Sequence, residues 1–258
     1  MEINCFNTRL FILEVYKMRI IVANDYEEMS RKAAQIIASQ LVLKPNSVLG
    51  LATGSTPIDT YKELVTLYKN GIIDFSEVTS FNLDEYFGLP KDNSQSYDYF
   101  MRTNLFNHIN IDVDRINIPN GMTDNVEREC AEYEKKMKVA GGVDLQLLGI
   151  GRNGHIGFNE PSDHFEPNTH LVQLDEDTIE ANSRFFDSID DVPTKAISMG
   201  VGSIMRAKKV LLLASGAGKA DAIYDTVKGP ITPKVPASIL QLHPDVVIIV
   251  DKEAASRL

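Results

Sequence analysis

The stretch Val48-Leu-Gly-Leu-Ala-Thr-Gly-Ser-Thr-Pro57 decides the fold of this chain. Its apolar start, Val48–Ala52, is nearly continuous rather than alternating, which is typical of a strand covered on both faces in a parallel sheet. Gly54 permits a tight turn, and Pro57 suits the first position of a helix. Apolar residues then recur at the spacing of one helix face, at Ile58, Tyr61, Val65 and Tyr68. The stretch predicts a strand, a turn and a helix in immediate succession.

The same succession repeats along the chain. Further apolar runs predict strands at Arg19–Ala23, Val78–Leu83, Leu145–Ile150, Ala196–Met199, Val210–Ala214 and Val246–Val250. Asp25 is a candidate cap for a helix after the first run, and a later helical pattern ends at Gly141-Gly142. We therefore expect an α/β fold with a single doubly wound, mostly parallel sheet and helices on both faces, a Rossmann-like arrangement. Residues 18–258 are expected to form one domain, and residues 1–17 an N-terminal extension.

Composition and charge exclude several classes of protein. The chain has 258 residues and a formal net charge of −10, so it lacks the basic balance of a nucleic-acid-binding protein, although a local pocket for a small anion stays possible. Its two cysteines form no disulfide framework, and Cys130 lies on an apolar helical stripe, as a core residue would. No apolar run approaches the length of a membrane span or of a secretory signal. We expect a cytoplasmic protein without membrane contact.

Ligands of open parallel sheets bind beyond the carboxyl ends of the strands, so the residues after each predicted strand are the candidate site. After the second strand, Thr53, Gly54, Ser55 and Thr56 combine a turn, hydroxyl groups and a helix start, which together suit a phosphate. The alternative is that Thr56 is a simple helix cap. The loop lacks the Gly-Lys-Ser/Thr ending of a nucleotide-binding P-loop, and no residue cluster suggests a metal. We expect neither a cofactor nor a metal.

Two further junctions carry groups suited to proton transfer. Asp84 and Glu85 are adjacent, so one carboxylate faces the cleft and the other faces away; an Asp there is either a general base or a cap in a turn. The glycine-rich loop from Gly149 to Gly157 carries His155, with Glu160 five residues later. A carboxylate beside an imidazole orients it and raises its pKa, which gives an acid/base pair that works near neutrality.

A fourth junction adds a cation. Ser215-Gly-Ala-Gly-Lys219 is another glycine-rich turn before a helix, and a lysine at a helix start is unfavourable unless an anion binds there. Arg184 is a candidate second anchor, although it is equally compatible with an ordinary surface position. Together these residues predict a cleft that holds a phosphate at one end and acid/base groups at the other. Proton abstraction next to a carbonyl on a phosphorylated small molecule fits that arrangement.

These segments together resemble the glucosamine-6-phosphate deaminase family from Met18 onward. The resemblance rests on motifs in the same order, which are Gly50-Leu-Ala-Thr-Gly-Ser-Thr-Pro57, Phe81-Asn-Leu-Asp-Glu-Tyr86, Gly88-Leu-Pro90, Gly154-His-Ile-Gly-Phe-Asn-Glu-Pro161, Asn182-Ser-Arg-Phe-Phe186 and Val235-Pro-Ala-Ser-Ile-Leu-Gln-Leu-His243. It implies conversion of glucosamine 6-phosphate and water to fructose 6-phosphate and ammonia, in amino-sugar catabolism. Alternatives on the same fold are a 6-phosphogluconolactonase-type hydrolase and a non-catalytic sugar-phosphate sensor.

The resemblance also implies roles for individual residues. His155, tuned by Glu160, would open the sugar ring, and Asp84 would move a proton from C2 to C1. The phosphate would lie on the Thr53–Thr56 loop, with Lys219 and Arg184.

The chain departs from the family pattern at two places. Asn153 stands where many members carry Asp, so it can orient His155 but cannot supply charge, and we keep it in the ring-opening set. The stretch from Ser162 to Val172 contains no Lys or Arg, whereas the enteric enzymes bind their activator through basic residues there. We therefore expect no allosteric activation by N-acetylglucosamine 6-phosphate. The sequence leaves open whether the protein is a monomer or a homo-oligomer.

Overall fold

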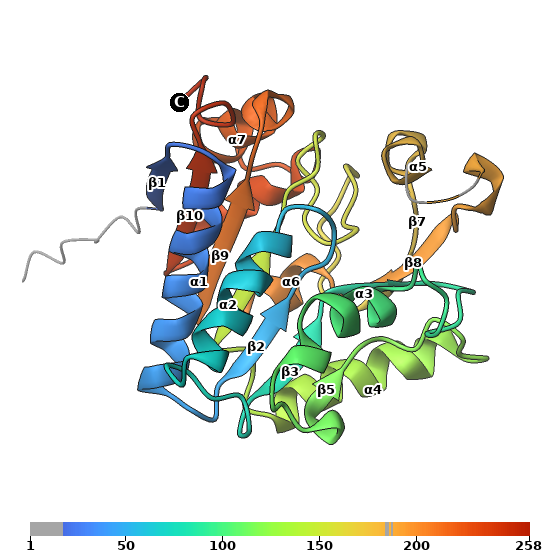
Figure 1. Ribbon diagram of the computed structural model, residues 1–258. Helices are drawn as coiled ribbons and strands as arrows, with labels where there is room; N and C mark the ends of the chain where they lie inside the picture. Colours follow the sequence, from blue (N-terminus) through green and yellow to red (C-terminus); the bar gives the residue numbers. More distant parts are fainter. Residues whose placement is uncertain (1–17, 184–185, 187) are drawn as a thin grey trace, which may run out of the picture.

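A computed structural model describes residues 18–183, 186 and 188–258. Within those residues, one sheet has seven strands in the order β1-β10-β9-β6-β2-β3-β5, and every pair in it is parallel. The strands are β1 (Arg19–Ala23), β2 (Val48–Leu51), β3 (Thr79–Asn82), β5 (Ile116–Asn117), β6 (Leu145–Leu148), β9 (Lys209–Ala214) and β10 (Val246–Asp251). The expected parallel α/β fold is confirmed, as Figure 1 shows.

Helices pack against this sheet, and α1 and α2 lie side by side in front of it in Figure 1. The helices are α1 (Tyr26–Leu43), α2 (Ile58–Lys69), α3 (Tyr97–Asn104), α4 (Val126–Val139), α5 (Glu176–Ser183), α6 (Val201–Met205) and α7 (Ala220–Lys228). Shorter 3₁₀ turns are η1 (Phe106–His108), η2 (Val113–Arg115), η3 (Ile189–Asp191), η4 (Ala217–Lys219) and η5 (Pro236–Leu242).

The helix ends follow the predicted chemistry, with one exception. Asp25 caps α1 by accepting a hydrogen bond from the Glu28 amide at 2.8 Å, as predicted. The predicted stop after α4 is also correct, since Gly141 and Gly142 both have positive φ. At the start of α2 two expectations are wrong: Thr56 is not a simple cap and Pro57 is not the first helical residue, because Pro57 holds the cap position, Ile58 begins the helix and no side chain caps that end.

Continuous burial explains why the central strands could be read from the sequence. Every residue of β2, β6 and β10 is buried, because helices cover both faces of the sheet there.

Cys130 is buried on α4, and burial raises the pKa of its thiol to about 11, so it is a poor nucleophile at neutral pH. No helix in the described ranges is long and apolar enough to cross a membrane.

The run at Ala196–Met199 forms a strand in a different place from the one expected. It becomes β8 (Lys195–Ser198), the middle strand of a second, three-stranded sheet with β4 (Asp84–Tyr86) and β7 (His170–Gln173), in which both pairs are antiparallel. All of β8 except Lys195 is buried. Burial on both faces makes a run apolar whichever sheet it joins, so the pattern alone did not separate the two sheets.

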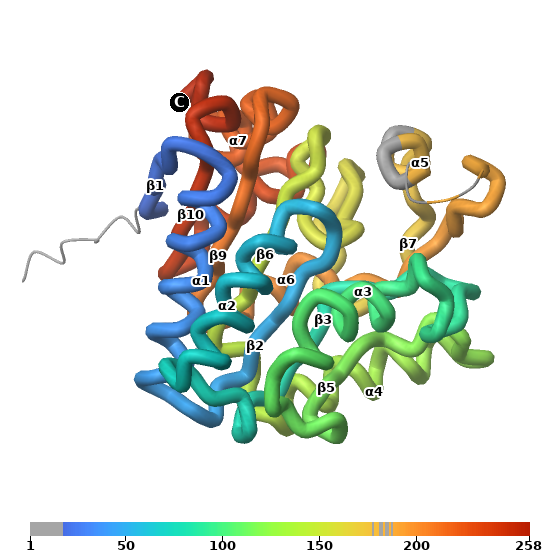
Figure 2. The backbone as a smooth tube through the Cα atoms, viewed as in Figure 1, coloured from blue at the N-terminus to red at the C-terminus, as the bar shows by residue number. Residues whose placement is uncertain are grey.

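The order of the central strands reverses between β2 and β6. From β2 the chain proceeds outward through β3 to β5, and from β6 it proceeds the other way through β9 to β10. The loops that leave these two neighbouring strands therefore start side by side and turn in opposite directions, which opens a crevice in such folds. Figure 2 traces both loops from the same end of the sheet.

Candidate active site

The loop after β2 is fixed at its base by two tyrosines. The Tyr61 hydroxyl donates a hydrogen bond to the Ala52 carbonyl at 2.5 Å, and the Tyr26 hydroxyl donates to the Ser55 carbonyl at 3.1 Å. Gly54 has φ of 87°, the left-handed region that favours glycine. The loop thus holds one shape, with Ser55 exposed and its neighbours half-buried. A preset loop of this kind binds an anion at low entropic cost.

Asp84 lies at the start of β4, directly after the turn that follows β3. It is 6% exposed and pairs with Ser198 of β8. Burial, assisted by the charge of Glu85, raises the pKa of the Asp84 carboxyl to about 8. A carboxyl group with that pKa gains and loses its proton near physiological pH, which suits a general acid or base.

Glu85 has a different task from its neighbour. Its carboxylate accepts hydrogen bonds from the backbone amides of Tyr86, Tyr97 and Asp98, each at 2.9 Å, so it holds the start of α3. Burial raises the pKa of Glu85 to about 7 in spite of these bonds. The carboxylate of Glu85 is therefore occupied at the start of α3, whereas that of Asp84 lies near the backbone of Gly157.

His155 and Glu160 form the pair expected from the glycine-rich loop. His155 Nδ1 lies 3.1 Å from Glu160 Oε2, and Asn153 Nδ2 donates to the same oxygen at 2.9 Å. Thr178 of α5 donates to Glu160 Oε1 at 2.6 Å. Burial raises the pKa of Glu160, but the hydrogen bonds from these three side chains outweigh it and hold that pKa below its usual value. Glu160 thus stays ionised beside the imidazole.

The same loop passes directly over Asp84. The Phe158 amide donates to Ser198 Oγ at 3.0 Å, and Asn159 Nδ2 donates to the Met199 carbonyl at 2.8 Å, which fastens the loop to the end of β8. A side chain at Gly157 would begin 3.6 Å from Asp84 Oδ2. Glycine is favoured at this point by its φ of 59° and by the Ser198 hydroxyl, which would lie only 3.0 Å from a side chain there. Asp84 and the His155 loop therefore belong to one site.

Tyr97 joins three of the four predicted junctions. Its hydroxyl interacts with those of Thr53 in the β2 loop and Tyr86 in β4, and burial raises its pKa well above the usual value. Its ring stacks on Phe158 of the His155 loop, with centroids 6.0 Å apart and 14° between the planes. Nothing in the sequence marked Tyr97, because its Ser96-capped helix looks like an ordinary helix start.

The turn after β9 carries Lys219 and is held by carboxylates from the end of the chain. Lys219 Nζ donates to the Ile150 carbonyl at 2.6 Å, which brings the lysine to the glycine-rich loop as expected. The amides of Gly216 and Ala217, however, donate to the carboxylates of Asp251 and Glu253. These two amides are therefore bonded within the protein, and the turn also carries the side chain of Lys219. Arg184 lies outside the described residues.

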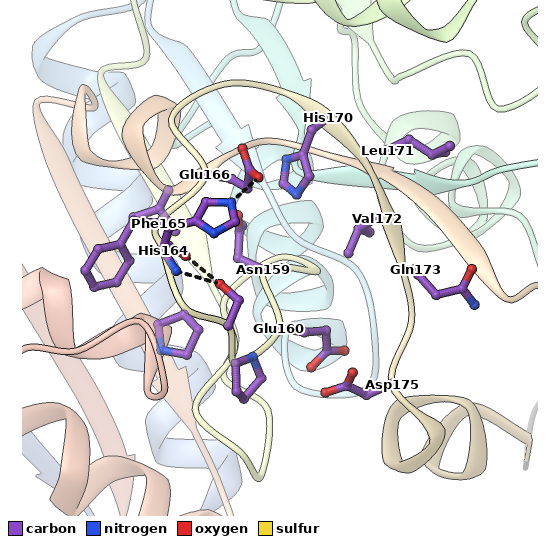
Figure 3. A pocket seen from close by; sticks show the side chains of 14 residues that line it. Asn159, Glu160, His164, Phe165, Glu166, His170, Leu171, Val172, Gln173 and Asp175 are labelled. Atoms are coloured by element: carbon purple, nitrogen blue, oxygen red, sulfur yellow. Dashed lines mark hydrogen bonds and ion pairs between the residues drawn. The ribbon is translucent and has the colours of Figure 1, made fainter.

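A cavity of about 280 Å³ adjoins the site at Glu160. Figure 3 shows the carboxylates of Glu160 and Asp175 at one side of it and the His164–Glu166 pair, 2.7 Å apart, at another. Asp84 and His155 do not line it. In the described part of the chain, no three His, Cys, Asp or Glu side chains are grouped to hold a metal ion. Asp84 and His155 are the candidates for acid/base chemistry at this site.

Comparison with known proteins relates the chain to one family. The model of the family described as glucosamine-6-phosphate isomerases/6-phosphogluconolactonase matches residues 24–248. The glucosamine-6-phosphate deaminase of Clostridium botulinum (strain Hall) is 64% identical over 241 residues, which are 93% of this chain and 99% of that protein. The glucosamine-6-phosphate deaminase of Clostridioides difficile (strain 630) is 62% identical over 93% of this chain and 97% of that protein.

Solved structures show the same relationship. A monomeric glucosamine-6-phosphate deaminase superposes with a TM-score of 0.91 at 47% identity, covering 93% of this chain and all of that one. The 6-phosphogluconolactonase of Thermotoga maritima has a TM-score of 0.74 at 20% identity, over 92% of this chain and all of its own, and shares the fold. The chain belongs to the glucosamine-6-phosphate isomerase/6-phosphogluconolactonase family, in which it groups with the glucosamine-6-phosphate deaminases.

Proposed function

We propose that this protein converts glucosamine 6-phosphate and water to fructose 6-phosphate and ammonia. The observation that carries the proposal is the placement of Asp84, with its pKa raised to about 8, beneath the loop that holds the His155–Glu160 pair. Aldose–ketose isomerisation needs one group that moves a proton between two carbons and another that moves a proton between ring oxygens. The two acid/base groups of the site match these two tasks.

The substrate phosphate would bind at the switch between β2 and β6. Thr53, Gly54, Ser55 and Thr56 would surround it from the β2 loop, and Lys219 would contact it from the turn after β9, with Arg184 as a further cation. The fixed base of the β2 loop supports this assignment, as does the position of Lys219 at the Ile150 carbonyl. Binding the phosphate there would place the sugar between the loop and Asp84.

Proton transfers would then proceed from these groups. His155, oriented by Asn153 and kept beside ionised Glu160, would carry a proton from O1 to O5 and open the ring. Asp84 would take the proton from C2 and return it to C1, while a proton passes from the amine to O1; this converts the C1 aldehyde of the open-chain 2-amino sugar through an enolamine to the C2 imine. Water would add to that imine, and ammonia would leave. The atoms of the overall reaction balance, because the water consumed provides the carbonyl oxygen of fructose 6-phosphate.

An ammonia-coupled assay tests this proposal against the lactonase alternative. We expect ammonia release from glucosamine 6-phosphate in proportion to enzyme, and no acid release from 6-phosphogluconolactone above the uncatalysed rate. Acid release without ammonia would contradict the proposal and favour the hydrolase. Binding of the sugar phosphate without either reaction would favour a sensor. Repeating the assay with Asp84→Asn connects the activity to the site.

We further propose the setting in which the enzyme acts. Residues 18–258 would form one catalytic domain that works in the cytoplasm during N-acetylglucosamine degradation, without a cofactor or a nucleic-acid partner. The absence of Lys and Arg from Ser162 to Val172 supports a lack of activation by N-acetylglucosamine 6-phosphate. The similarity to a monomeric deaminase supports activity without a hexamer. Addition of the N-acetylated sugar to the assay, and sedimentation of the active enzyme, test these two points.

A further inference from the structure

Asp251 commits its carboxylate to the turn that carries Lys219. It is the last residue of β10 and is 6% exposed. Its Oδ2 accepts hydrogen bonds from the Ser215 hydroxyl at 2.5 Å and the Gly216 amide at 2.9 Å. Its Oδ1 accepts from the Ala254 amide at 2.8 Å and also lies 3.1 Å from the Gly216 amide. A buried carboxylate is tolerated only when its oxygens are bonded in this way.

These bonds set the shape of the turn. Gly216 has φ of 89° and directly precedes η4, the single turn that ends at Lys219. Glu253 adds a weaker contact, at 3.3 Å, to the Ala217 amide. From there the Lys219 side chain extends to the Ile150 carbonyl in the glycine-rich loop. A continuous set of hydrogen bonds thus runs from Asp251 through the turn to the cation.

The same bonds determine which groups of this turn can bind an anion. Free amides at a glycine-rich helix start would themselves bind a phosphate. Here the amides of Gly216 and Ala217 donate to carboxylates, so neither of these two amides is directed at a ligand, and the charged group that this turn carries is the ammonium of Lys219. Its position then depends on the carboxylate that holds the turn.

We propose that Asp251 is a positioning residue for the substrate phosphate, and that it acts through Lys219 without touching the substrate. This inference rests on the proposed function, because it concerns the same phosphate site. Loss of the carboxylate leaves two amides and a hydroxyl without their acceptor and lets the turn rearrange. The consequence is weaker phosphate binding with the proton transfers at Asp84 unchanged.

The first test compares Asp251→Ala, Asp251→Asn and Ser215→Ala with wild type. We expect Asp251→Ala to raise the KM for glucosamine 6-phosphate about tenfold, the range of one charge-assisted hydrogen bond, with kcat within about twofold. Asn keeps one acceptor oxygen, so Asp251→Asn should have an intermediate effect, and Ser215→Ala a smaller one. The matched control is Asp245→Asn, at the other end of β10, where Asp245 pairs with Lys209 at the surface. It should leave both constants unchanged.

A double-mutant cycle separates positioning from general destabilisation. In a Lys219→Ala background, Asp251→Ala should raise KM no further, because the group through which it acts is gone. The same comparison is made on the dissociation constant of inorganic phosphate, which requires no turnover. An unchanged KM in Asp251→Ala, a fall in kcat alone, or an equal tenfold effect without Lys219 would overturn the proposal. If Asp251→Ala does not fold, Asp251→Asn and Ser215→Ala decide the outcome in the same cycle.

The phosphate measurement also keeps this inference distinct from the proposed reaction. Wild-type protein that binds phosphate but releases no ammonia would refute the reaction alone. Phosphate binding that ignores Asp251 while ammonia is released would refute the positioning role alone.

Discussion

Replacing Asp84 by Asn should make the protein more stable above neutral pH and at the same time abolish its catalysis. The pKa of Asp84 is raised from 3.8 to about 8, chiefly by burial. Between those two values the folded protein keeps a proton that the unfolded chain releases. The free energy of unfolding therefore falls as the pH rises through this window, and Asn, which cannot ionise, removes that fall.

The size of the gain follows from the same two values. One pKa unit corresponds to about 1.36 kcal/mol, so the full interval sets an upper bound of ~6 kcal/mol at high pH. Water and structural relaxation reduce the cost of a buried charge in real proteins, and we expect a gain of ~2–3 kcal/mol at pH 8.5. The gain should shrink to nothing near pH 4. Removal of the base should lower kcat by about 10²–10⁴-fold.

Urea unfolding of both proteins between pH 4 and 8.5, followed by circular dichroism, measures the gain. Asp144→Asn is the control, because it should change the free energy of unfolding at high pH in the opposite direction. Asp144 is also buried, but hydrogen bonds to Lys208, Lys44 and the Val48 amide outweigh burial and lower its pKa. That substitution should destabilise the protein at pH 8.5, and less so at low pH. An Asp84→Asn gain that is independent of pH, or activity close to wild type, would refute the assignment of Asp84.

The remaining predictions concern four other side chains. His155→Gln should lower kcat/KM about 10²-fold or more on the closed sugar ring but far less on an open-chain substrate; equal losses on both would exclude ring opening as its task. Thr178→Val removes the 2.6 Å bond to Glu160, so the pKa of Glu160 should rise and the acidic limb of kcat/KM should move to higher pH; an unmoved limb would count against the pair. Lys219→Ala should raise KM about tenfold or more with little change in kcat, whereas an unchanged KM would place the phosphate elsewhere. Asn125→Ala removes the cap of α4 and should cost about 1 kcal/mol in urea unfolding without changing kinetics.

Much of the fold could be predicted because the deciding interactions are local or repetitive. Continuous apolar runs identified β2, β6 and β10, and capping chemistry placed the start of α1 at Asp25. Other features had no such signal, among them the strands β4 and β7, which no apolar run predicted. β5 is only two residues long, and β8 leaves the central sheet for a second one. Strand pairing depends on distant partners, which a local pattern does not contain.

In the candidate site, too, some residues have a local sequence signal and others do not. Asp84, His155 and Glu160 could be proposed from the sequence, because Asp84 directly follows a predicted strand, His155 lies in the glycine-rich loop and Glu160 comes soon after that loop. Tyr97 and Asp251 have no such signal, because their contacts are with partners more than ten residues away: Tyr97 interacts with Thr53 and Phe158, and Asp251 with the turn after β9. Residues that hold the groups of a site in place have no distinctive sequence around them, so only the folded structure identifies them.

A crystal structure of Asp84→Asn with glucosamine 6-phosphate bound would test the central claim most directly. We expect the phosphate within hydrogen-bonding distance of the Thr53–Thr56 loop and of Lys219 Nζ, with C2 of the sugar about 3.5 Å from the side chain at position 84 and the ring oxygen facing His155. A phosphate bound away from that loop, or a C2 atom that faces neither side chain, would contradict the account.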